Sequence, residues 1–539
     1  MSDRAGSDAP TARVLTRRRA LGLAAGTGGW LLGAAALGGC HVALPFSGAA
    51  GVPEPPALGR PETLDLIANP GDNDALITLQ TLQGVLAQTR PRLYLQMGGG
   101  YGRWLEAVRA AGVKVQPAPG DVWTLLRTHA HELGGVVLYS PYEPDGINLA
   151  TTLAGPLRAV AVSAPQRSLA EAAGLRVLAD TSGKSALWAF QNYWPKLRHD
   201  VLIEQDPGKA ALRDYGPAVR ALTYYSGNDA GRAEVLAALA PGSTVLGWGD
   251  ASHGENAFVG ADSAAGSYNV ASDLAYNLTA LAGVRLPLRQ PRPQGQAGPA
   301  AGTGKHTVTF VMTDGDNIQW VMNDFTTSAQ WFGNHQRGSV PMGWTTSPIL
   351  ARLAPPVLHW MYGAATPGRD VFLAGPSGLG YAYPSHMPDR AAFAAASARA
   401  MAEAGLNLVT IIDSGGFRPE VLGDYLGQPQ IRGLLYWEYS RYDAQHGRIL
   451  WVNRKPAVSA RFLLWTPQFN DPGGLATRLN VLPADPTSPE GYSLVAVHAW
   501  SQGFPGVLAT VPQLAPHVEV VTPDIFFERL SMHGAGQTG

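Results

Sequence analysis

KHTVTFVMTDGDN, residues 305–317, joins a run of β-branched and apolar side chains to a short loop of acids and glycine. Residues 307–312 have the composition of a buried β-strand. The loop that follows, Thr313–Asn317, carries two carboxylates and an amide around a glycine that favours a turn. Parallel strands that end in such residues are typical of folds that carry their site at the carboxyl ends of the strands.

The rest of the C-terminal half repeats this alternation of strand and helix. Further strands are predicted at residues 340–345, 371–375, 407–412, 432–437, 459–465, 493–498 and 518–521. Helical patterns separate most of them, notably at residues 389–404, which end at Gly405, and at residues 506–514. Strand followed by helix, repeated through residues 305–531, predicts a (β/α) barrel-like domain.

The preceding region, residues 63–285, is predicted to form open α/β structure. Short apolar strands alternate there with helical runs rich in Ala and Leu, and the clearest strands are residues 92–96, 135–139, 159–162 and 244–248. This pattern is typical of parallel sheets, and the length accommodates two or three small subdomains. Residues 286–304 are dense in Pro, Gly and Gln without periodicity, which predicts an interdomain linker.

The N-terminus has the pattern of an export signal. Three arginines at positions 17–19 precede an apolar, glycine-rich stretch that closes on Leu37-Gly-Gly-Cys40. A basic start, an apolar middle and a small-residue exit predict a signal peptide over residues 1–40. The paired arginines resemble a twin-arginine signal, and the ending resembles a lipobox in which Cys40 is lipidated. The alternative of a transmembrane anchor is disfavoured because the apolar stretch falls short of ~20 residues.

Residues 41–62 are rich in Pro and small side chains, which predicts a flexible tether between the lipid and the folded body. We therefore expect an exported cell-envelope lipoprotein that contacts the membrane through its lipid anchor only. Because Cys40 is the sole cysteine, a disulfide, a thiolate metal site and a cysteine nucleophile are excluded from the mature chain.

Composition excludes other classes of protein. The 539 residues are 45% hydrophobic and only 15% charged, which is typical of a globular chain with a large core rather than a disordered one. The formal charge of −1 gives no field that would attract nucleic acid, so nucleic-acid binding is not expected.

Polar and aromatic residues recur where the predicted barrel strands end. They are Asp314, Asp316, Asn317, Tyr381, Tyr383, Asp413, Trp437, Glu438, His498 and Trp500. In (β/α) barrels these ends converge on one mouth, where the site lies. Aromatic faces pack on the apolar faces of sugar rings, and carboxylates bind hydroxyls. The pattern therefore predicts a carbohydrate site at the barrel mouth, which the N-terminal α/β region could roof.

The segment Gly378–Pro384, GLGYAYP, matches every fixed position of the motif GxGYxYP and resembles the family of glycoside hydrolases named after it. Residues 78–95, 145–154 and 273–277 resemble N-terminal blocks of the same family. The resemblance covers nearly the whole mature chain. It implies N-terminal α/β subdomains, a distorted C-terminal barrel and hydrolysis of glycosidic bonds.

Glycoside hydrolysis needs two carboxyl groups across the scissile bond, one as acid and the other as nucleophile or base. Asp314, Asp316 and Glu438 are the predicted catalytic residues. The two aspartates are close enough in sequence for one to raise the pKa of the other, and the aromatic surroundings of Glu438 favour a protonated general acid. The structural alternatives are an aspartate that caps the following helix and a salt bridge at Glu438.

The other residues at the mouth are predicted to bind substrate. Tyr381, Tyr383, Trp437 and Trp500 are expected to stack on sugar rings, while Asn317, Asp413 and His498 are expected to hydrogen-bond hydroxyls. For each tyrosine, packing of the loop against the barrel is the structural alternative, and for His498 and Trp500 it is a packed wall of the last strands.

Two other functions stay open at this point. A metal-dependent polysaccharide deacetylase would hold a divalent ion with Asp and His and use it to activate water, but the chain lacks the paired histidines of such a site, His386 being alone. We therefore expect no metal and no other cofactor. The second alternative is a surface protein that binds glycans without cleaving them.

Overall fold

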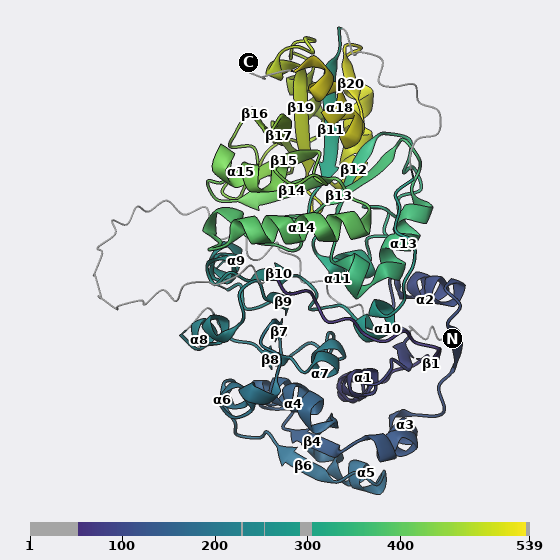
Figure 1. Ribbon diagram of the computed structural model, residues 1–539. Helices are drawn as coiled ribbons and strands as arrows, with labels where there is room; N and C mark the ends of the chain where they lie inside the picture. The colour runs from purple at the N-terminus through teal and green to yellow at the C-terminus, as the bar shows by residue number, and fades with distance from the viewer. Residues whose placement is uncertain (1–51, 228–229, 253, 292–303, 535–539) are drawn as a thin grey trace, which may run out of the picture. The chain divides into compact units, whose positions relative to one another are not determined.

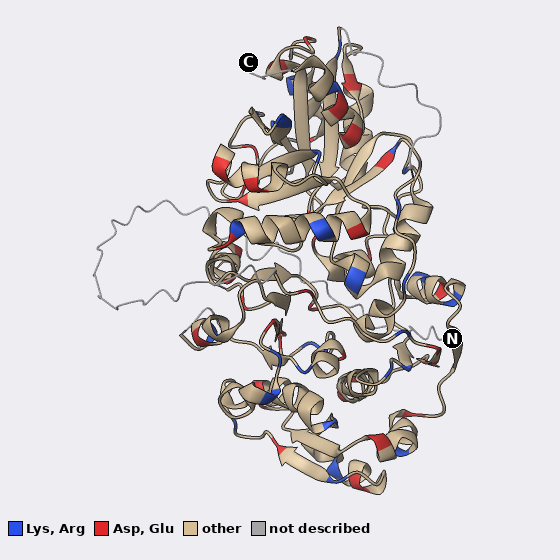
Figure 2. Ribbon diagram, in the orientation of Figure 1, with Lys and Arg blue, Asp and Glu red and all other residues tan. Residues whose placement is uncertain are grey.

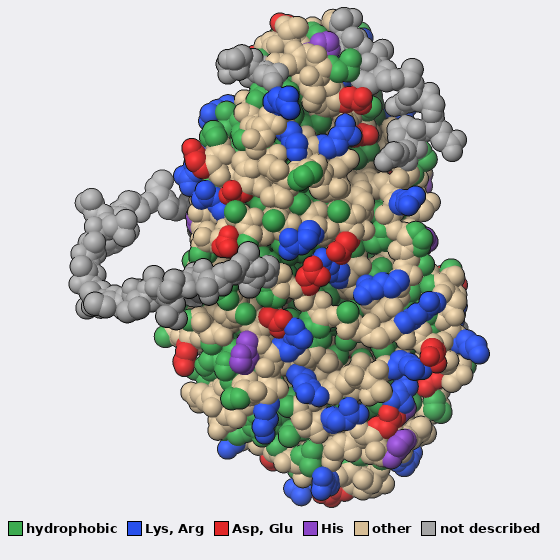
Figure 3. Space-filling model, in the orientation of Figure 1, with side chains coloured by type: hydrophobic (Ala, Val, Ile, Leu, Met, Phe, Trp, Pro, Cys, Tyr) green, Lys and Arg blue, Asp and Glu red, His purple; other side chains and the backbone are tan. Residues whose placement is uncertain are grey.

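The computed structural model describes residues 52–227, 230–252, 254–291 and 304–534 (Figure 1). The predicted signal peptide and lipobox, including Cys40, lie outside these ranges. Within them, no helix combines the length and apolarity needed to cross a membrane. Acidic and basic residues are interspersed along the ribbon (Figure 2), and charges of both signs are scattered over the face shown in Figure 3.

Three small parallel sheets make up the N-terminal region, which confirms the open α/β prediction. The first has the order β2-β1-β3, the second β5-β4-β6 and the third β10-β9-β7-β8. The strands are β1 (Thr63–Ile67), β2 (Leu93–Leu95), β3 (Lys114–Pro117), β4 (Gly135–Tyr139), β5 (Ala159–Ser163), β6 (Val177–Asp180), β7 (Val201–Glu204), β8 (Leu222–Tyr224), β9 (Thr244–Gly247) and β10 (Tyr268–Val270). Each begins a strand–helix unit, as parallel pairing requires.

The helices of this region lie between its strands. They are α1 (Asn73–Ala87), α2 (Tyr101–Ala110), α3 (Val122–His129), α4 (Pro144–Leu157), α5 (Arg167–Ala172), α6 (Trp188–Tyr193), α7 (Tyr215–Val219), α8 (Ala230–Ala238), α9 (Glu255–Ala264) and α10 (Leu278–Ala282). Helix α1 starts where the Asp72 carboxylate accepts a hydrogen bond from the backbone N–H of Ala75, an N-cap that satisfies one of the free amides of the first turn.

A ten-stranded curled sheet makes up the C-terminal region, and nearly all of its strands are parallel. Its order is β16-β17-β15-β14-β13-β12-β11-β19-β18, with β20 paired to β11. The strands are β11 (His306–Met312), β12 (Met342–Thr346), β13 (Asp370–Ala374), β14 (Leu408–Asp413), β15 (Gly433–Glu438), β16 (Ile449–Val452), β17 (Lys455–Ser459), β18 (Phe462–Leu464), β19 (Tyr492–Val497) and β20 (Val518–Val520).

Helices follow most of these strands. They are α11 (Ile318–Met322), α12 (Leu350–Leu353), α13 (Pro355–Ala364), α14 (Arg390–Ala404), α15 (Pro419–Leu426), α16 (Pro472–Leu479), α17 (Gly503–Thr510) and α18 (Pro523–His533). Helix α14 lies where it was predicted, and Gly405 ends it in the left-handed conformation that glycine adopts without strain. The barrel-like α/β fold is thus confirmed.

One hairpin was missed by the sequence pattern. Strands β16 and β17 pair antiparallel around the two-residue turn Asn453-Arg454, both of whose residues have positive φ. Such turns usually have the sequence Asn-Gly or Asp-Gly. Here arginine takes the position of the glycine, so the turn could not be recognised from the sequence. The hairpin begins between the predicted strands 432–437 and 459–465.

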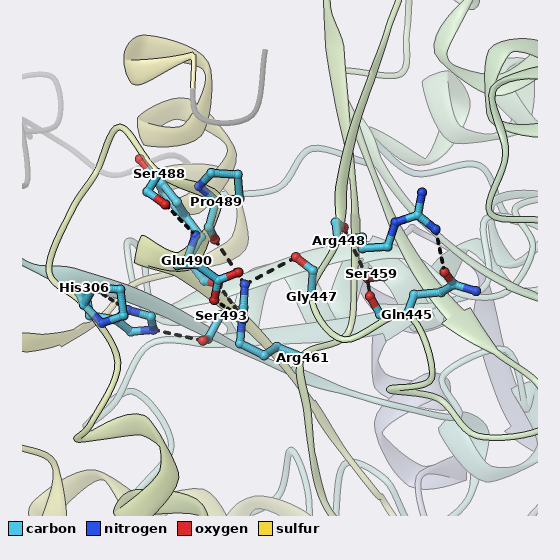
Figure 4. Close-up of polar contacts among 12 residues, drawn as sticks. His306, Gln445, Gly447, Arg448, Ser459, Arg461, Ser488, Pro489, Glu490 and Ser493 are labelled. Atoms are coloured by element: carbon cyan, nitrogen blue, oxygen red, sulfur yellow. Dashed lines mark hydrogen bonds and ion pairs between the residues drawn. The ribbon is translucent and has the colours of Figure 1, made fainter. Parts of the chain in front are cut away.

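The curled sheet closes through the consecutive strands β17 and β18. Strand β17 pairs with β15 at one end of the sheet, and β18 pairs with β19 at the other. At the junction, Ala460 N–H donates to Tyr436 O (3.1 Å) and Arg461 N–H donates to Leu494 O (2.9 Å). Figure 4 shows the Arg461 side chain between Gly447 and Glu490, and its Nη1 lies 2.7 Å from the Glu490 carboxylate.

Alternate residues of the barrel strands enter different hydrophobic clusters. Val311, Leu373, Leu435 and Leu494 share one cluster, whereas their strand neighbours pack in another. The first cluster also contains Phe526, Phe527 and Leu530 of α18. The Phe527 ring packs directly on Gly433, where a β carbon would lie 2.3 Å from it. Helix α18 therefore covers the end of the barrel at which the strands begin, opposite the mouth.

Parts of the predicted tether and linker contact the folded body. Within residues 52–62, the backbone O of Pro56 accepts a hydrogen bond from the Tyr215 hydroxyl, and Glu54 pairs with Arg352. Within residues 286–291, the Gln290 amide bonds both the N–H and the O of Phe372. These described parts of the two segments are therefore held against the folded body by hydrogen bonds and an ion pair.

Phe527→Ala is expected to destabilise the barrel by about 3–5 kcal/mol, because it removes a buried ring and leaves a cavity under the strands. Met532→Ala, on the same helix but 55% exposed, is the matched control and should change little. Thermal unfolding of both variants checks this, and equal melting temperatures would contradict the role given to α18.

Candidate active site

The loop after β11 carries two of the predicted catalytic carboxylates. Asp314 has a φ of 70°, a left-handed conformation that few residues other than Gly, Asn and Asp adopt. Gly315 crosses the end of β12, where its N–H donates to Thr345 Oγ1 (2.9 Å), and a β carbon on it would lie 1.7 Å from Thr345 O. The Asp-Gly-Asp sequence is therefore needed for a tight turn at the barrel mouth.

Both aspartates are only 4% exposed. The Thr313 hydroxyl donates to the Asp314 carboxylate, and the Asn317 side-chain amide donates back to Asp314 O (3.1 Å). The N-cap position of α11 is occupied by Asn317, so neither aspartate takes the capping position that was the structural alternative. The Asn317 side-chain amide is thus used in a hydrogen bond within the loop. Its binding of a substrate hydroxyl stays a prediction.

Glu438, the third predicted catalytic residue, ends β15. Its Oε1 accepts the N–H of Gly415 (2.9 Å) and its Oε2 accepts the Tyr436 hydroxyl (3.1 Å). Burial, reinforced by the nearby Glu438 and Asp413, raises the pKa of the Tyr436 phenol far above its usual value, so the phenol remains a donor at neutral pH. Within the described ion pairs Glu438 has no partner.

Asp413 ends the neighbouring strand β14 and pairs with Glu438 in register. Its carboxylate accepts hydrogen bonds from Ser385 N (2.9 Å), Ser385 Oγ (2.6 Å) and Ser414 N (2.8 Å). Burial raises the pKa of Asp413. These bonds tie together the loops that follow β13 and β14, and the predicted contact of Asp413 with a substrate hydroxyl remains untested.

The predicted catalytic carboxylates follow or end two strands of the curled sheet that are not neighbours, β11 and β15. Three strands separate β11 from β15 in one direction, and in the other they are separated by β19 and the β17–β18 segment. Because all of these strands run parallel, their carboxyl ends lie at the same end of the barrel. The Asp314 turn and Glu438 therefore lie at the same end of the barrel, on two strands that are not neighbours.

An arc of aromatic rings lines the mouth between these carboxylates; it consists of Trp437, Tyr442, Trp465 and His498. Trp437 stacks on Tyr442 (ring centroids 5.6 Å apart), Tyr442 meets Trp465 edge to face (5.6 Å), and Trp465 stacks on His498 (3.7 Å). His498 follows β19, whose neighbour is β11. The arc thus runs from the strand of Glu438 to β19, the strand beside that of Asp314.

Rings of the arc differ in exposure. Trp437 is fully buried, whereas Tyr442, Trp465 and His498 are half-buried, and Phe469, edge to face with Trp465, is 36% exposed. Trp437 therefore supports Tyr442 from behind. Its buried position does not favour the predicted stacking on a sugar ring. Trp465 and Phe469 were missed, although Trp465 ends the predicted strand 459–465 and the rule applied to the other strand ends would have selected it.

Trp500 belongs to a different group of rings. It packs against Trp320 (4.9 Å) and Trp331 (5.6 Å), on the helix and loop that follow the Asp314 turn. Trp331 Nε1 also donates to Ala499 O (2.8 Å). The structure therefore places Trp500 in a packed wall beside α11, and it brings together His498 and Trp465 instead of His498 and Trp500.

The GLGYAYP segment joins the barrel to the third N-terminal sheet. Tyr381 and Asn269, the middle residue of β10, exchange backbone hydrogen bonds of 2.7 and 2.9 Å. The Tyr381 hydroxyl donates to Glu255 of α9 (2.7 Å), and Tyr383 N–H donates to Ser263 Oγ (2.9 Å). A β carbon on Gly380 would lie 2.7 Å from Asn269 O. Both tyrosine rings are buried. Their burial favours the structural alternative, in which they pack the loop against the barrel, over stacking on a sugar ring.

Three models of one protein family match the chain. "GxGYxYP putative glycoside hydrolase C-terminal domain" matches residues 304–531, "GxGYxYP_N second domain" matches residues 133–197, and "GxGYxYP third domain" matches residues 199–283. The chain belongs to the GxGYxYP family. The segment that names this family is, in this member, the joint between its barrel and its N-terminal region.

A solved structure is similar over most of the chain. It is a crystal structure of a "putative hydrolase" from Bacteroides thetaiotaomicron VPI-5482, 26% identical, with a TM-score of 0.80; the match covers 88% of this GxGYxYP chain and 96% of the other. A comparison with curated proteins gave no match.

The N-terminal region of this GxGYxYP protein also holds the acidic turn from outside. Helix α11, which follows the turn, has five residues, too few to be stable alone. Trp104 Nε1 donates to Met322 O (2.8 Å), Asn323 Nδ2 donates to Leu274 O (3.1 Å), and Gln319 N–H donates to Ala271 O (3.3 Å). The first and third N-terminal sheets thereby position the residues that follow Asp316.

A buried ionic cluster underlies α9. Arg232 Nε lies 2.7 Å from Glu204 and its Nη2 lies 2.6 Å from Asp262, with all three side chains at most 1% exposed. The guanidinium carbon lies 4.5 Å from the ring centroid of Phe258 in α9. Burial raises the pKa of both Glu204 and Asp262, because one guanidinium is shared by two desolvated carboxyl groups.

Arg232→Met is expected to cost about 3–5 kcal/mol near pH 8, since it leaves two buried carboxyl groups without their cation. A carboxyl group whose pKa is raised by folding takes up protons as the pH falls, so the loss should shrink toward pH 5. Thermal unfolding at both pH values checks this. Arg167→Met, which breaks the exposed pair with Glu171, is the control and should cost at most ~1 kcal/mol; an equal loss at both pH values would contradict the account.

Proposed function

We propose that this protein hydrolyses glycosidic bonds at the barrel mouth, with the Asp314–Asp316 pair acting from one wall and Glu438 from the other. The observation that carries the proposal is the position of these carboxylates, which lie at the carboxyl ends of two non-neighbouring strands, β11 and β15, of one curled sheet and are each less than 10% exposed. Membership of the GxGYxYP family and similarity to the crystal structure of a "putative hydrolase" support the reaction class.

The chemistry needs a proton for the leaving oxygen and a carboxylate on the opposite side of the sugar. One wall supplies the proton and the other acts as nucleophile or as base toward water. Burial of all three groups excludes bulk water, which strengthens their interaction with the positive charge that develops on the sugar ring. Tyr436 and Gly415 hold Glu438 in place through the hydrogen bonds described above.

An assay with polysaccharides and aryl glycosides tests the reaction. Reducing ends and acetate are measured with and without a chelator after incubation with the purified protein. We expect new reducing ends that are insensitive to the chelator. Acetate release that the chelator abolishes would instead indicate the metal-dependent deacetylase, although no group of His, Cys, Asp or Glu arranged to hold a metal occurs among the described residues. Binding without a product would indicate a glycan-binding protein.

Asp314→Asn, Asp316→Asn and Glu438→Gln test the catalytic assignment. Loss of an acid or of a nucleophile or base should lower kcat by about 100- to 10,000-fold while the melting temperature changes little. Glu420→Gln, a carboxylate exposed on α15, is the matched control and should retain full activity. Full activity of all three variants at the mouth would refute the assignment.

We also infer that the protein is exported and held at the cell envelope by a lipid on Cys40. The support is the sequence of residues 13–40, with its paired arginines and Leu-Gly-Gly-Cys ending. Cys40→Ser should shift the protein from the membrane fraction to the soluble fraction and abolish incorporation of labelled fatty acid. Because Cys40 is the only cysteine, label that persists in the variant would contradict the assignment.

A further inference from the structure

The loop after β18 carries two aromatic rings, Trp465 and Phe469, and its conformation is held by hydrogen bonds within the loop. Trp465 N–H donates to Asn470 O (3.1 Å), and Phe469 N–H donates to Trp465 O (2.8 Å). The Asn470 side chain donates to Leu463 O (2.9 Å) and ties the end of the loop back to the strand. Both rings are therefore fixed before any ligand arrives, which lowers the entropy cost of binding.

Trp465 forms the corner of this surface. The His498 ring stacks on it in parallel, with 2° between the planes, and the Tyr442 and Phe469 rings stand at 77° and 66° to it. His498 is oriented by Ser501, whose Oγ lies 2.9 Å from Nδ1. Three rings thus meet around one indole, and one of them, Phe469, is among the few large apolar side chains of the described residues that are more than a third exposed.

This corner adjoins both sets of carboxylates. On one side, Ala499, next to His498, donates its N–H to Thr313 Oγ1 (3.3 Å), and the Thr313 hydroxyl in turn donates to Asp314. On the other side, Tyr442 stacks on Trp437, the neighbour of Glu438. A molecule that lies on the corner is therefore beside the proposed point of cleavage.

The polar groups around the corner are balanced in charge. The Arg441 guanidinium lies 5.3 Å from the centre of the Phe469 ring, and its Nε pairs with Asp443 (2.6 Å). Gln502 Nε2 bonds the Thr466 hydroxyl (2.5 Å), and Gln468 is exposed. Amides and hydroxyls beside aromatic rings, without net charge, suit a ligand that has hydroxyl groups and an apolar face.

We propose that Trp465 and Phe469 form a subsite that binds an uncharged sugar unit of the substrate, next to the bond that is cleaved. The apolar face of the sugar ring packs against the aromatic corner while its hydroxyls reach the amides and Arg441. The proposal rests on the proposed function in one respect, namely that the substrate is a saccharide.

Binding to a glycan array tests the subsite. The purified protein is compared with Trp465→Ala, Phe469→Ala and the control Trp123→Ala, a half-buried tryptophan of α3 remote in sequence from the barrel. We expect the apparent affinity for the glycan bound best to fall by about tenfold or more in each variant at the corner and to stay unchanged in the control. Phe469→Ala removes an exposed ring, so it remains informative if Trp465→Ala fails to fold.

Salt and kinetics give independent readouts. Because Arg441 already has a carboxylate partner, affinity should change little when the ionic strength rises from about 0.1 to about 1 M. On oligosaccharides, Phe469→Ala should raise KM and leave kcat nearly unchanged, whereas on a small aryl glycoside, which is too short to occupy the corner, it should change neither. A large loss of affinity in salt would overturn the assignment to an uncharged sugar.

The catalytically impaired variant Asp314→Asn with Glu438→Gln separates this proposal from the proposed function. It should lose hydrolysis and still bind the array, with the same dependence on Phe469. If the unaltered protein binds glycans through the corner but cleaves none, the hydrolase assignment fails and the subsite stands. The subsite is refuted if affinity is the same in the unaltered and Phe469→Ala proteins, or if the unaltered protein binds no glycan.

Discussion

The backbone hydrogen bonds of residues 455–464 hold the two ends of the curled sheet together, and the geometry of the candidate site depends on them. The first half of this segment pairs with β15 and the second with β19. Without that closure the strand of Glu438 would end an open sheet far from the strand of Asp314. Arg461 reinforces the junction by pairing with Glu490 and bonding the Tyr492 backbone. A barrel that closes in this way brings carboxyl groups from opposite walls to one mouth.

The N-terminal sheets help to position the segments that carry the candidate site. They contact two segments at the barrel mouth. One is the Tyr381 loop, which pairs with Asn269, and the other is the short helix α11, whose last residue accepts a hydrogen bond from the Trp104 indole. Helix α11 has only five residues and depends on these contacts, because a single turn of helix is unstable alone. The family motif therefore has a clear structural reason: Gly380 permits close approach of β10, Gly378 packs against Ser397 of α14, and the two tyrosines are the buried parts of the joint.

Buried and more exposed aromatic rings have different roles at the barrel mouth. Trp437, Tyr381 and Tyr383 lie behind the surface and fix the loops, whereas Trp465 and Phe469 face outward on a loop that its own backbone bonds hold rigid. Sites of this kind are accurate because the residues that meet the ligand are supported by a second layer whose rotamers are locked by packing. The same division separates Asp314 and Asp316, on a strained turn at the mouth, from Asp413, which ties two loops together.

Local patterns in the chain were enough to predict the α/β class, the strand positions in the barrel and the carboxylates at the strand ends, because strand periodicity and turn residues are short-range signals. They could not reveal the hairpin at Asn453-Arg454, whose turn lacks its usual glycine. They also could not tell which aromatic rings are buried: Trp437 was chosen from its place at a strand end but is fully buried, whereas the half-buried Trp465 and the more exposed Phe469 were missed. Stacking of His498 on Trp465 and pairing of Tyr381 with Asn269 join residues distant in sequence. Such contacts depend on how the sheet closes and how its neighbours dock, so only the tertiary structure decides them.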